Sequence, residues 1–182
     1  MDLKDVETQI LALIEELNPN SDYLTDDPDI SAKIHFVINQ IQTELTRIKK
    51  LPAKTTMEVT KDQSILITDI DADIYQLSVI RDVDYDIIDD TIIFKEDGTA
   101  NIYYYKFPTM INEENKATYK FNLPNDLMQI LPYGVAGDLL KSDISANYGT
   151  IYANRYEQMK RMIDPRYATE TIYIEEGDKY GI

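Results

Sequence analysis

Cysteine is absent from this sequence of 182 residues, and histidine occurs only once. The lack of cysteine excludes disulfide bonds, thiolate zinc sites and cysteine nucleophiles. Six glycines leave little material for a phosphate-binding loop, and neither Gly-x-x-x-x-Gly-Lys nor Gly-x-Gly-x-x-Gly occurs. The single histidine, His35, is accompanied by no Gly-x-Ser-x-Gly signature, so we expect it to be structural. We therefore predict a protein that is not an enzyme and has no cofactor.

Long apolar runs are also absent, since no run approaches the ~18–20 residues that span a bilayer. The N-terminal sequence MDLKDVETQ lacks the basic start and apolar centre of a signal peptide. We expect a protein that is made in the cytoplasm and does not bind membranes.

Basic residues are few, with 18 Lys and Arg against 33 Asp and Glu, which gives a formal net charge of −15. A surface with so few basic residues is poorly suited to binding nucleic acid, because phosphate binding depends on lysine and arginine displacing counterions. A negatively charged conduit would instead repel a duplex and let it slide past. The simplest role for the charge is solubility.

Apolar residues at spacings of three and four predict helices near residues 2–17, 28–50, 125–143 and 147–163. The second helix has the clearest start, because Asp27 is a good cap and Pro28 suits the first helical position. Pro132 lies inside the third helix, where we expect a kink or a restart. We predict an α+β fold that is mainly an α-helical bundle.

Residues 55–122 have β-branched and alternating runs in place of the helical period. Asp97-Gly98 between two such runs is a hairpin signal. We predict an antiparallel β insertion over about 55–122 within one domain of residues 1–182, and an exposed loop at 108–116. Residues 1–52 and 123–164 would form the helical core, and 165–182 an extended C-terminal arm. Strands are expected at 57–60, 64–68, 75–81, 85–88, 91–95, 100–107, 117–123 and, on the arm, 169–176.

Crowded carboxylates occur at two places in the β insertion. Asp69, Asp71 and Asp73 resemble the start of a calcium loop, but Ile74 replaces the usual glycine and Ile80 the usual glutamate. The aspartates between Asp82 and Asp90 could bind magnesium, as in a nuclease. Either group could serve a metal-dependent phosphodiesterase. We expect both groups to be solvated edges. Ile70 and Ile74 alternate with the first group, as on a strand or turn whose acids face water, and only Arg81 and Lys95 lie near the second group to bind a phosphate substrate.

Tyrosine is abundant, with 14 residues. Its large ring and hydroxyl suit protein interfaces, although many tyrosines line cores. Candidate inter-subunit contacts, or core residues, are Tyr104, Tyr133, Tyr152 and Tyr156. Tyr173 and Tyr180 on the arm are better interface candidates, because an arm has little core of its own.

One stretch carries a resemblance to a known family. A strand-like run ending in Leu123-Pro124 is followed by DLMQILPYGVAGDLL, a short acidic break and YANRYEQMKRMID. This pattern resembles the C-terminal helical core of head–tail adaptor (connector) proteins of tailed bacteriophages. The order of elements agrees: two helices, a β insertion, two helices and a short tail.

The resemblance implies a structural virion protein located in the phage neck. It would dock on the portal protein, link the capsid to the tail and line part of the channel for genome ejection, through which DNA passes without specific binding. It implies a homo-oligomeric ring of roughly twelve copies built from head-to-tail contacts, although the chain alone could be a monomer. The family's C-terminal arm typically docks on the portal, and other surfaces receive the next neck or tail protein. Carried onto this sequence, the partner-binding arm comprises Tyr167, Thr171, Ile172, Tyr173, Ile174 and Tyr180.

A different class of function remains open. An acidic binding protein could mimic DNA or inhibit a host enzyme, and it would gather its carboxylates on one surface. An adaptor would keep its flanks mixed in charge.

Overall fold

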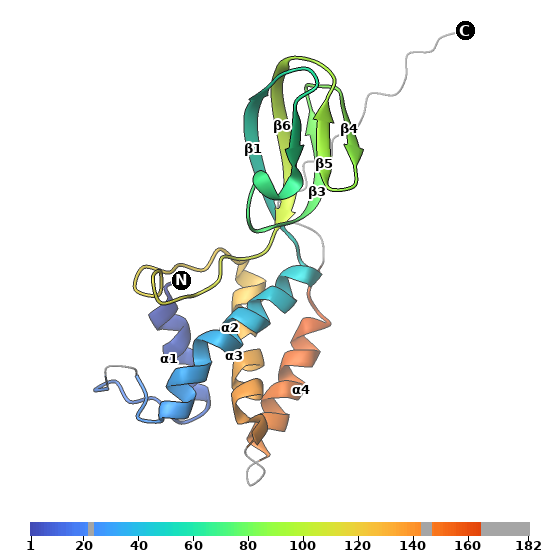
Figure 1. Cartoon of the computed structure of the whole chain (residues 1–182). Coiled ribbons are helices and arrows are strands. Elements are labelled where there is room, and N and C mark those ends of the chain that lie inside the picture. Colours follow the sequence, from blue (N-terminus) through green and yellow to red (C-terminus); the bar gives the residue numbers. More distant parts are fainter. Residues whose placement is uncertain (22–23, 143–146, 165–182) are drawn as a thin grey trace.

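The computed structural model describes residues 1–21, 24–142 and 147–164, and these form two parts (Figure 1). One part is helical and the other is built from two antiparallel three-stranded sheets. The described residues are about 42% helical and 25% strand. The prediction of a mainly α-helical bundle is therefore wrong. The chain is α+β, because its strands form a second packed structure with its own core.

Four α-helices form the helical part within the described ranges: α1 (Leu3–Leu13), α2 (Pro28–Ile48), α3 (Asn125–Leu139) and α4 (Tyr148–Lys160). The cap predicted for α2 is confirmed, since the Asp27 carboxylate accepts hydrogen bonds from the N–H groups of Asp29 and Ile30. α1 is shorter than expected, because Glu15 has a φ of 62° and turns the chain out of the helix. α3 runs through Pro132 without a restart, and the 3-10 helix η2 (Leu140–Ser142) follows it.

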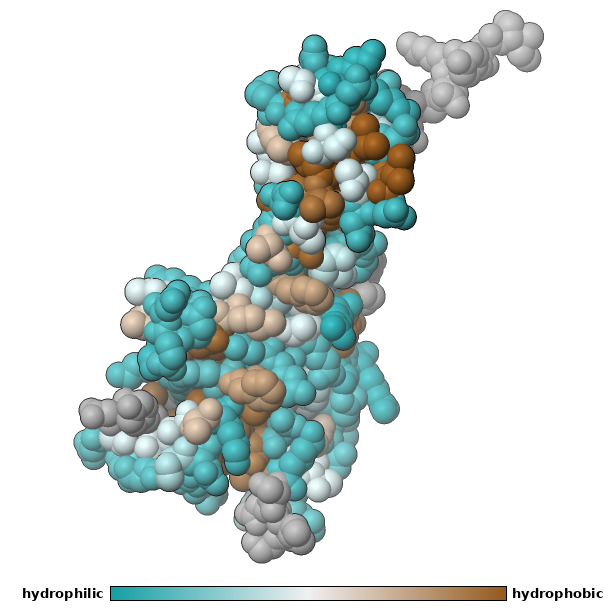
Figure 2. All heavy atoms as spheres, viewed as in Figure 1, coloured by the Kyte–Doolittle hydropathy of each residue, from teal (hydrophilic) through white to brown (hydrophobic). Residues whose placement is uncertain are grey.

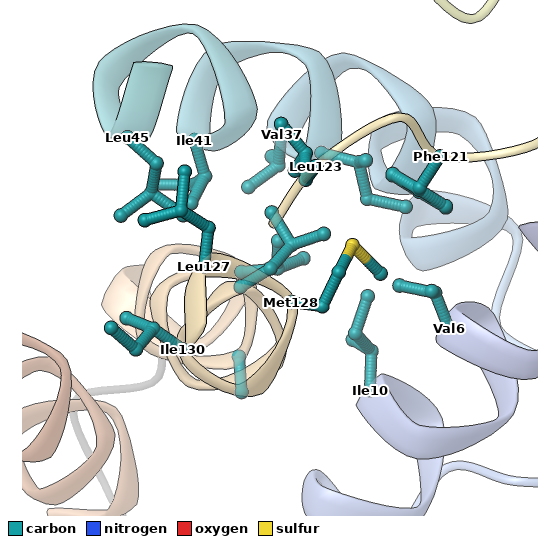
Figure 3. Packing of buried hydrophobic residues seen from close by; sticks show 14 of the residues in the cluster. Val6, Ile10, Val37, Ile41, Leu45, Phe121, Leu123, Leu127, Met128 and Ile130 are labelled. Atoms are coloured by element: carbon teal, nitrogen blue, oxygen red, sulfur yellow. The ribbon is translucent and has the colours of Figure 1, made fainter. Parts of the chain in front are cut away.

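α3 lies at the centre of the helical part, in contact with α1, α2 and α4. Figure 3 shows Val37, Ile41 and Leu45 of α2 directed toward α3. Met128 of α3 reaches toward the α1 residues Val6 and Ile10. Burying each such side chain contributes roughly 1.5–3 kcal/mol, so the shared core holds all four helices together.

A long segment between the two parts, residues 107–124, is tied to α2 by polar side chains that are half-buried or buried. Asn39 donates to the Ile111 carbonyl at 2.9 Å and accepts from the Ile111 N–H at 2.8 Å. The fully buried Gln42 donates to the carbonyl of Thr109 at 3.3 Å, and Tyr119 donates its hydroxyl to Gln42 at 3.1 Å. These hydrogen bonds satisfy backbone groups of the segment that would otherwise bond to a neighbouring strand.

The strand expected at Ala117–Leu123 does not form in this segment. Only a single bridge joins Asp2 to Lys120. The apolar alternation arises because Tyr119, Phe121 and Leu123 all enter the helical core while their neighbours face water.

The six strands among the described residues are β1 (Leu51–Val59), β2 (Ser64–Leu66), β3 (Ile74–Arg81), β4 (Tyr85–Ile88), β5 (Thr91–Phe94) and β6 (Gly98–Lys106), with the 3-10 helix η1 (Ile67–Asp69) after β2. They form two sheets of order β1-β6-β3 and β2-β5-β4. Each lies where an alternating run was expected, but β1 begins at Leu51, directly after α2.

The two sheets pack face to face. Ile92 and Phe94 of β5 and Ile102 of β6 are fully buried in one apolar cluster, which is separate from the helical core. Because side chains alternate along a strand, the outer faces of the two sheets point in opposite directions. The β part is therefore a small sandwich with two unlike exposed faces.

Phe107 joins the two parts. Its ring stacks on Tyr75 with centroids 4.8 Å apart, and the Arg47 guanidinium of α2 lies 5.7 Å from the Phe107 ring centroid. The Phe107 N–H donates to the Asp73 carbonyl at 2.9 Å. These contacts connect the end of α2 to the near end of the sandwich.

Candidate interaction surfaces

The predicted partner-binding arm lies outside the described residues, which end at Asp164. Tyr167, Thr171, Ile172, Tyr173, Ile174 and Tyr180 are therefore not placed, and their role stays a prediction. α4 ends on the side of the helical part that is nearest the sandwich (Figure 1).

The four tyrosines named as inter-subunit candidates all take part in contacts within the chain. Tyr104 and Tyr156 are buried, with exposed fractions of 6% and 5%. Tyr133 and Tyr152 are half-buried with ring centroids 6.5 Å apart, and Tyr152 donates its hydroxyl to the Leu13 carbonyl. Tyr133 and Tyr152 keep some exposed surface for a neighbour, whereas Tyr104 and Tyr156 offer little.

Tyr156 helps to fix α4 against the rest of the helical part. Burial raises the pKa of its hydroxyl, and the nearby Glu44 carboxylate raises it further. Lys160 lies 4.9 Å from the Tyr156 ring centroid and donates to Glu44 of α2 at 2.7 Å. These contacts give Tyr156 and Lys160 a structural role within the chain.

Of the three alternating aspartates, Asp71 is occupied by protein groups. It accepts from the Tyr104 hydroxyl at 2.9 Å and lies 3.4 Å from the Lys106 ammonium. Burial raises the pKa of Asp71, but the hydrogen bonds from the Asp73 N–H and Tyr104, with the charge of Lys106, outweigh it and leave the pKa below its usual value. Burial and the Asp71 carboxylate raise the pKa of Tyr104 to about 12. Within the described ranges, no three His, Cys, Asp or Glu side chains are grouped as a metal site.

His35 lies at the edge of a groove of about 720 Å³ between α1, α2 and residues 116–120. Its Nε2 is 2.6 Å from a Glu7 oxygen, and both side chains are mostly covered. This pair joins α2 to α1, which agrees with the structural role expected for His35.

A second groove, of about 580 Å³, lies on the outer surface of α2. Phe36 is 70% exposed and Met110 is 43% exposed beside it, with Gln40, Glu44 and Arg47 along its length. Phe36 and Met110 therefore form a small exposed apolar surface at this groove.

α4 carries a separate exposed apolar surface. Tyr148 is 57% exposed and Ile151 is 56% exposed, and Met162, just beyond the helix, is 82% exposed. Because these residues lie on a different helix from Phe36, the helical part has two unlike apolar surfaces.

The outer face of the β2-β5-β4 sheet carries apolar residues beside acids. The strand register places Leu66, Thr91 and Ile88 in one row, where Leu66 is 49% exposed and Ile88 is 59% exposed. Figure 2 shows apolar atoms gathered over β4 and β5. We define the apolar–acidic face as Leu66, Asp86, Ile88, Asp89, Asp90 and Ile93.

The outer face of the β1-β6-β3 sheet differs in character. The Tyr103 ring lies between two cations, with Lys54 at 5.3 Å and Arg81 at 5.5 Å from its centroid, and Lys50 lies 4.8 Å from the Tyr105 centroid. We define the basic–aromatic face as Lys50, Lys54, Arg81, Tyr103 and Tyr105 together with Arg47 of α2, which lies over the Phe107 ring just beyond β6. The sequence alone does not indicate this face, because it depends on β1 pairing with β6 so that Lys54 lies opposite Tyr103.

None of the described helices is long and apolar enough to cross a membrane. Compared with known proteins, the chain is matched by no family model and by no curated sequence.

Proposed function

We propose that this chain is a head–tail adaptor of a tailed bacteriophage, a virion protein of the neck that assembles as a ring on the portal. The observation that carries the proposal is the number of unlike exposed surfaces on one small chain. Apolar side chains are exposed on α2, on α4 and on the β2-β5-β4 sheet. Exposed apolar surface bordered by polar residues is typical of protein–protein contacts, and three such surfaces on different elements suit a chain with several neighbours.

A ring that links two assemblies needs several unlike contacts. Each copy meets two neighbours through different surfaces, because cyclic assembly beyond a dimer uses head-to-tail contacts. It also meets the portal below and the next neck or tail protein above. The order of elements in the resemblance, with the α3–α4 pair after the β part, supports the same reading.

The charge distribution favours an adaptor over an acidic DNA mimic. A mimic needs a continuous negative face, whereas the basic–aromatic face gathers four cations on a chain of net charge −15. A channel-forming ring with mixed flanks tolerates such a surface.

The test is to mix the full chain with purified portal rings from the same phage and to measure co-sedimentation. We expect the full chain to bind and a chain without residues 167–182 to remain folded, by circular dichroism, but not to bind. The matched control replaces the same residues with a Gly/Ser segment of equal length. Normal docking by the truncated chain would contradict the role of the arm, and failure of the full chain to bind would contradict the adaptor function.

A further inference from the structure

We infer that the basic–aromatic face of one copy binds the apolar–acidic face of the next copy, so that neighbouring sandwiches are joined around the ring. This inference rests on the proposed function, and it names the surfaces that would join the subunits. The occupant of each face is therefore a second copy of this chain.

The basic–aromatic face carries cations that lack an acidic partner within the described residues. Arg47, Lys50 and Lys54 form no ion pair with a carboxylate of the described residues. Each copy carries 33 carboxylates against 18 basic residues, so acids are available in excess to pair with these three cations. A partner that neutralises them must present acids, and every copy of this chain does so.

The apolar–acidic face has the complementary composition. Asp86, Asp89 and Asp90 are exposed, with Asp86 paired to Lys95 at 2.8 Å. They surround the exposed apolar pair Leu66 and Ile88. The apolar–acidic face thus has an apolar centre with charged neighbours, and it would meet tyrosines and cations on the other copy. Apolar and aromatic residues at the centre, with opposite charges around them, are typical of a protein interface.

The two faces lie on opposite sides of the sandwich. Both sheets contribute their inner side chains to one cluster, so the two outer faces point away from each other. Two different surfaces on opposite sides of a subunit make a head-to-tail contact, which generates a ring when the rotation between copies closes. In a ring of roughly twelve copies, neighbouring copies are related by a rotation of only about 30°, so the two contact surfaces of each copy have to lie on nearly opposite sides.

The absence of cysteine permits a direct test by disulfide cross-linking. The variant carries Lys54→Cys and Ile88→Cys, one on each face. These positions lie on the outer sides of two sheets that are about 10 Å apart, beyond the ~7 Å between Cα atoms that a disulfide within one copy can bridge. Oxidation should therefore give a ladder of multimers, both in concentrated solution and on portal rings.

Two controls define the contact. Lys54→Cys alone should give almost no dimer, because residue 54 does not meet its own counterpart in a head-to-tail contact. Lys54→Cys combined with Ile151→Cys, which lies on α4, should give no ladder. Efficient dimers of the single variant, or no more ladder from the double variant than from the α4 control, would overturn the inference.

The same samples separate this inference from the adaptor function. Portal binding without a ladder would refute only the pairing of the two faces. A ladder without portal binding would retain the pairing and refute the adaptor role. The competing occupant is single-stranded nucleic acid, which stacks bases on aromatic side chains beside cations. Binding of oligothymidylate that Lys54→Glu abolishes, with no ladder, would assign the face to nucleic acid and overturn the inference.

Discussion

Replacing Gly137 with alanine should destabilise the helical part, although alanine is the better helix former. A Cβ atom at this position would lie 2.9 Å from the Ala153 nitrogen and 3.1 Å from its Cα, both backbone atoms of α4. Backbone cannot rotate away as a flexible side chain does, so α4 has to shift. The shift is resisted by buried Tyr156 and by the pair between Lys160 and Glu44.

The magnitude follows from two opposing effects. Alanine gains about 1 kcal/mol over glycine in a helix, and overpacking a tight contact costs about 1–3 kcal/mol. Because the obstructing atoms belong to the backbone, we take the upper end of the overpacking range, about 3 kcal/mol. After the gain in helix propensity, the free energy of unfolding falls by ~2 kcal/mol. For a chain of this size that lowers the Tm by roughly 4–8 °C.

The assay is urea denaturation followed by circular dichroism at a helix-sensitive wavelength. Asn154→Ala is the matched control, because Asn154 is exposed on the same helix and gains helix propensity without new contacts. We expect this control to be as stable as the wild type or slightly more stable. A Gly137→Ala variant that matched or exceeded the wild type would refute the close approach of α3 and α4.

Three further changes test other features. Asn39→Leu removes both hydrogen bonds to Ile111 and should lower the free energy of unfolding by about 2–3 kcal/mol. Backbone amides of residues 109–119 should also exchange hydrogen faster, and wild-type exchange rates there would contradict the anchoring role of Asn39. Asp71 has a lowered pKa in the folded state, so the stability that its charge contributes is present above the usual carboxyl pKa and is lost as the pH falls through the lowered pKa. The Asp71→Asn variant should therefore be less stable than the wild type at pH 7 but nearly as stable at pH 2. An equal loss of stability at both pH values would refute this. Phe36→Ser should change unfolding free energy by less than about 0.5 kcal/mol while weakening assembly with neck proteins, and a large loss of stability would show that Phe36 packs within the chain.

The helices were largely predictable from local signals. Asp27 and Pro28 mark the start of α2 because a cap and a fixed φ act within a few residues. The end of α1 was not predictable from the apolar spacing, which continues to Leu17. The chain leaves the helix at Glu15 because of its left-handed backbone conformation, and Leu17 still packs against the core from outside α1.

The strands were found by alternation, but their importance for the fold class was underestimated. Alternation does not show which strands share a sheet, so it could not reveal that Phe94 and Ile102 meet in a second core. The same limit explains the false strand at Ala117–Leu123. One side of an extended segment can be apolar because it packs on helices, without any neighbouring strand.

The surfaces were the least predictable feature. Tyr103 was recognised as a strand residue, but its position between Lys54 and Arg81 depends on pairs that are far apart in the sequence. Tyr104, by contrast, was considered for a subunit contact and is buried on Asp71. Neighbouring residues on one strand thus have opposite roles, and only the register decides which ring faces outward.

The most direct measurement is electron microscopy of portal rings mixed with the full chain. Our account predicts a closed ring of density on one end of each portal, with one copy of this chain for each portal subunit or a fixed fraction of that number. Portals without added density, together with a chain that sediments as a monomer in the same mixture, would contradict it.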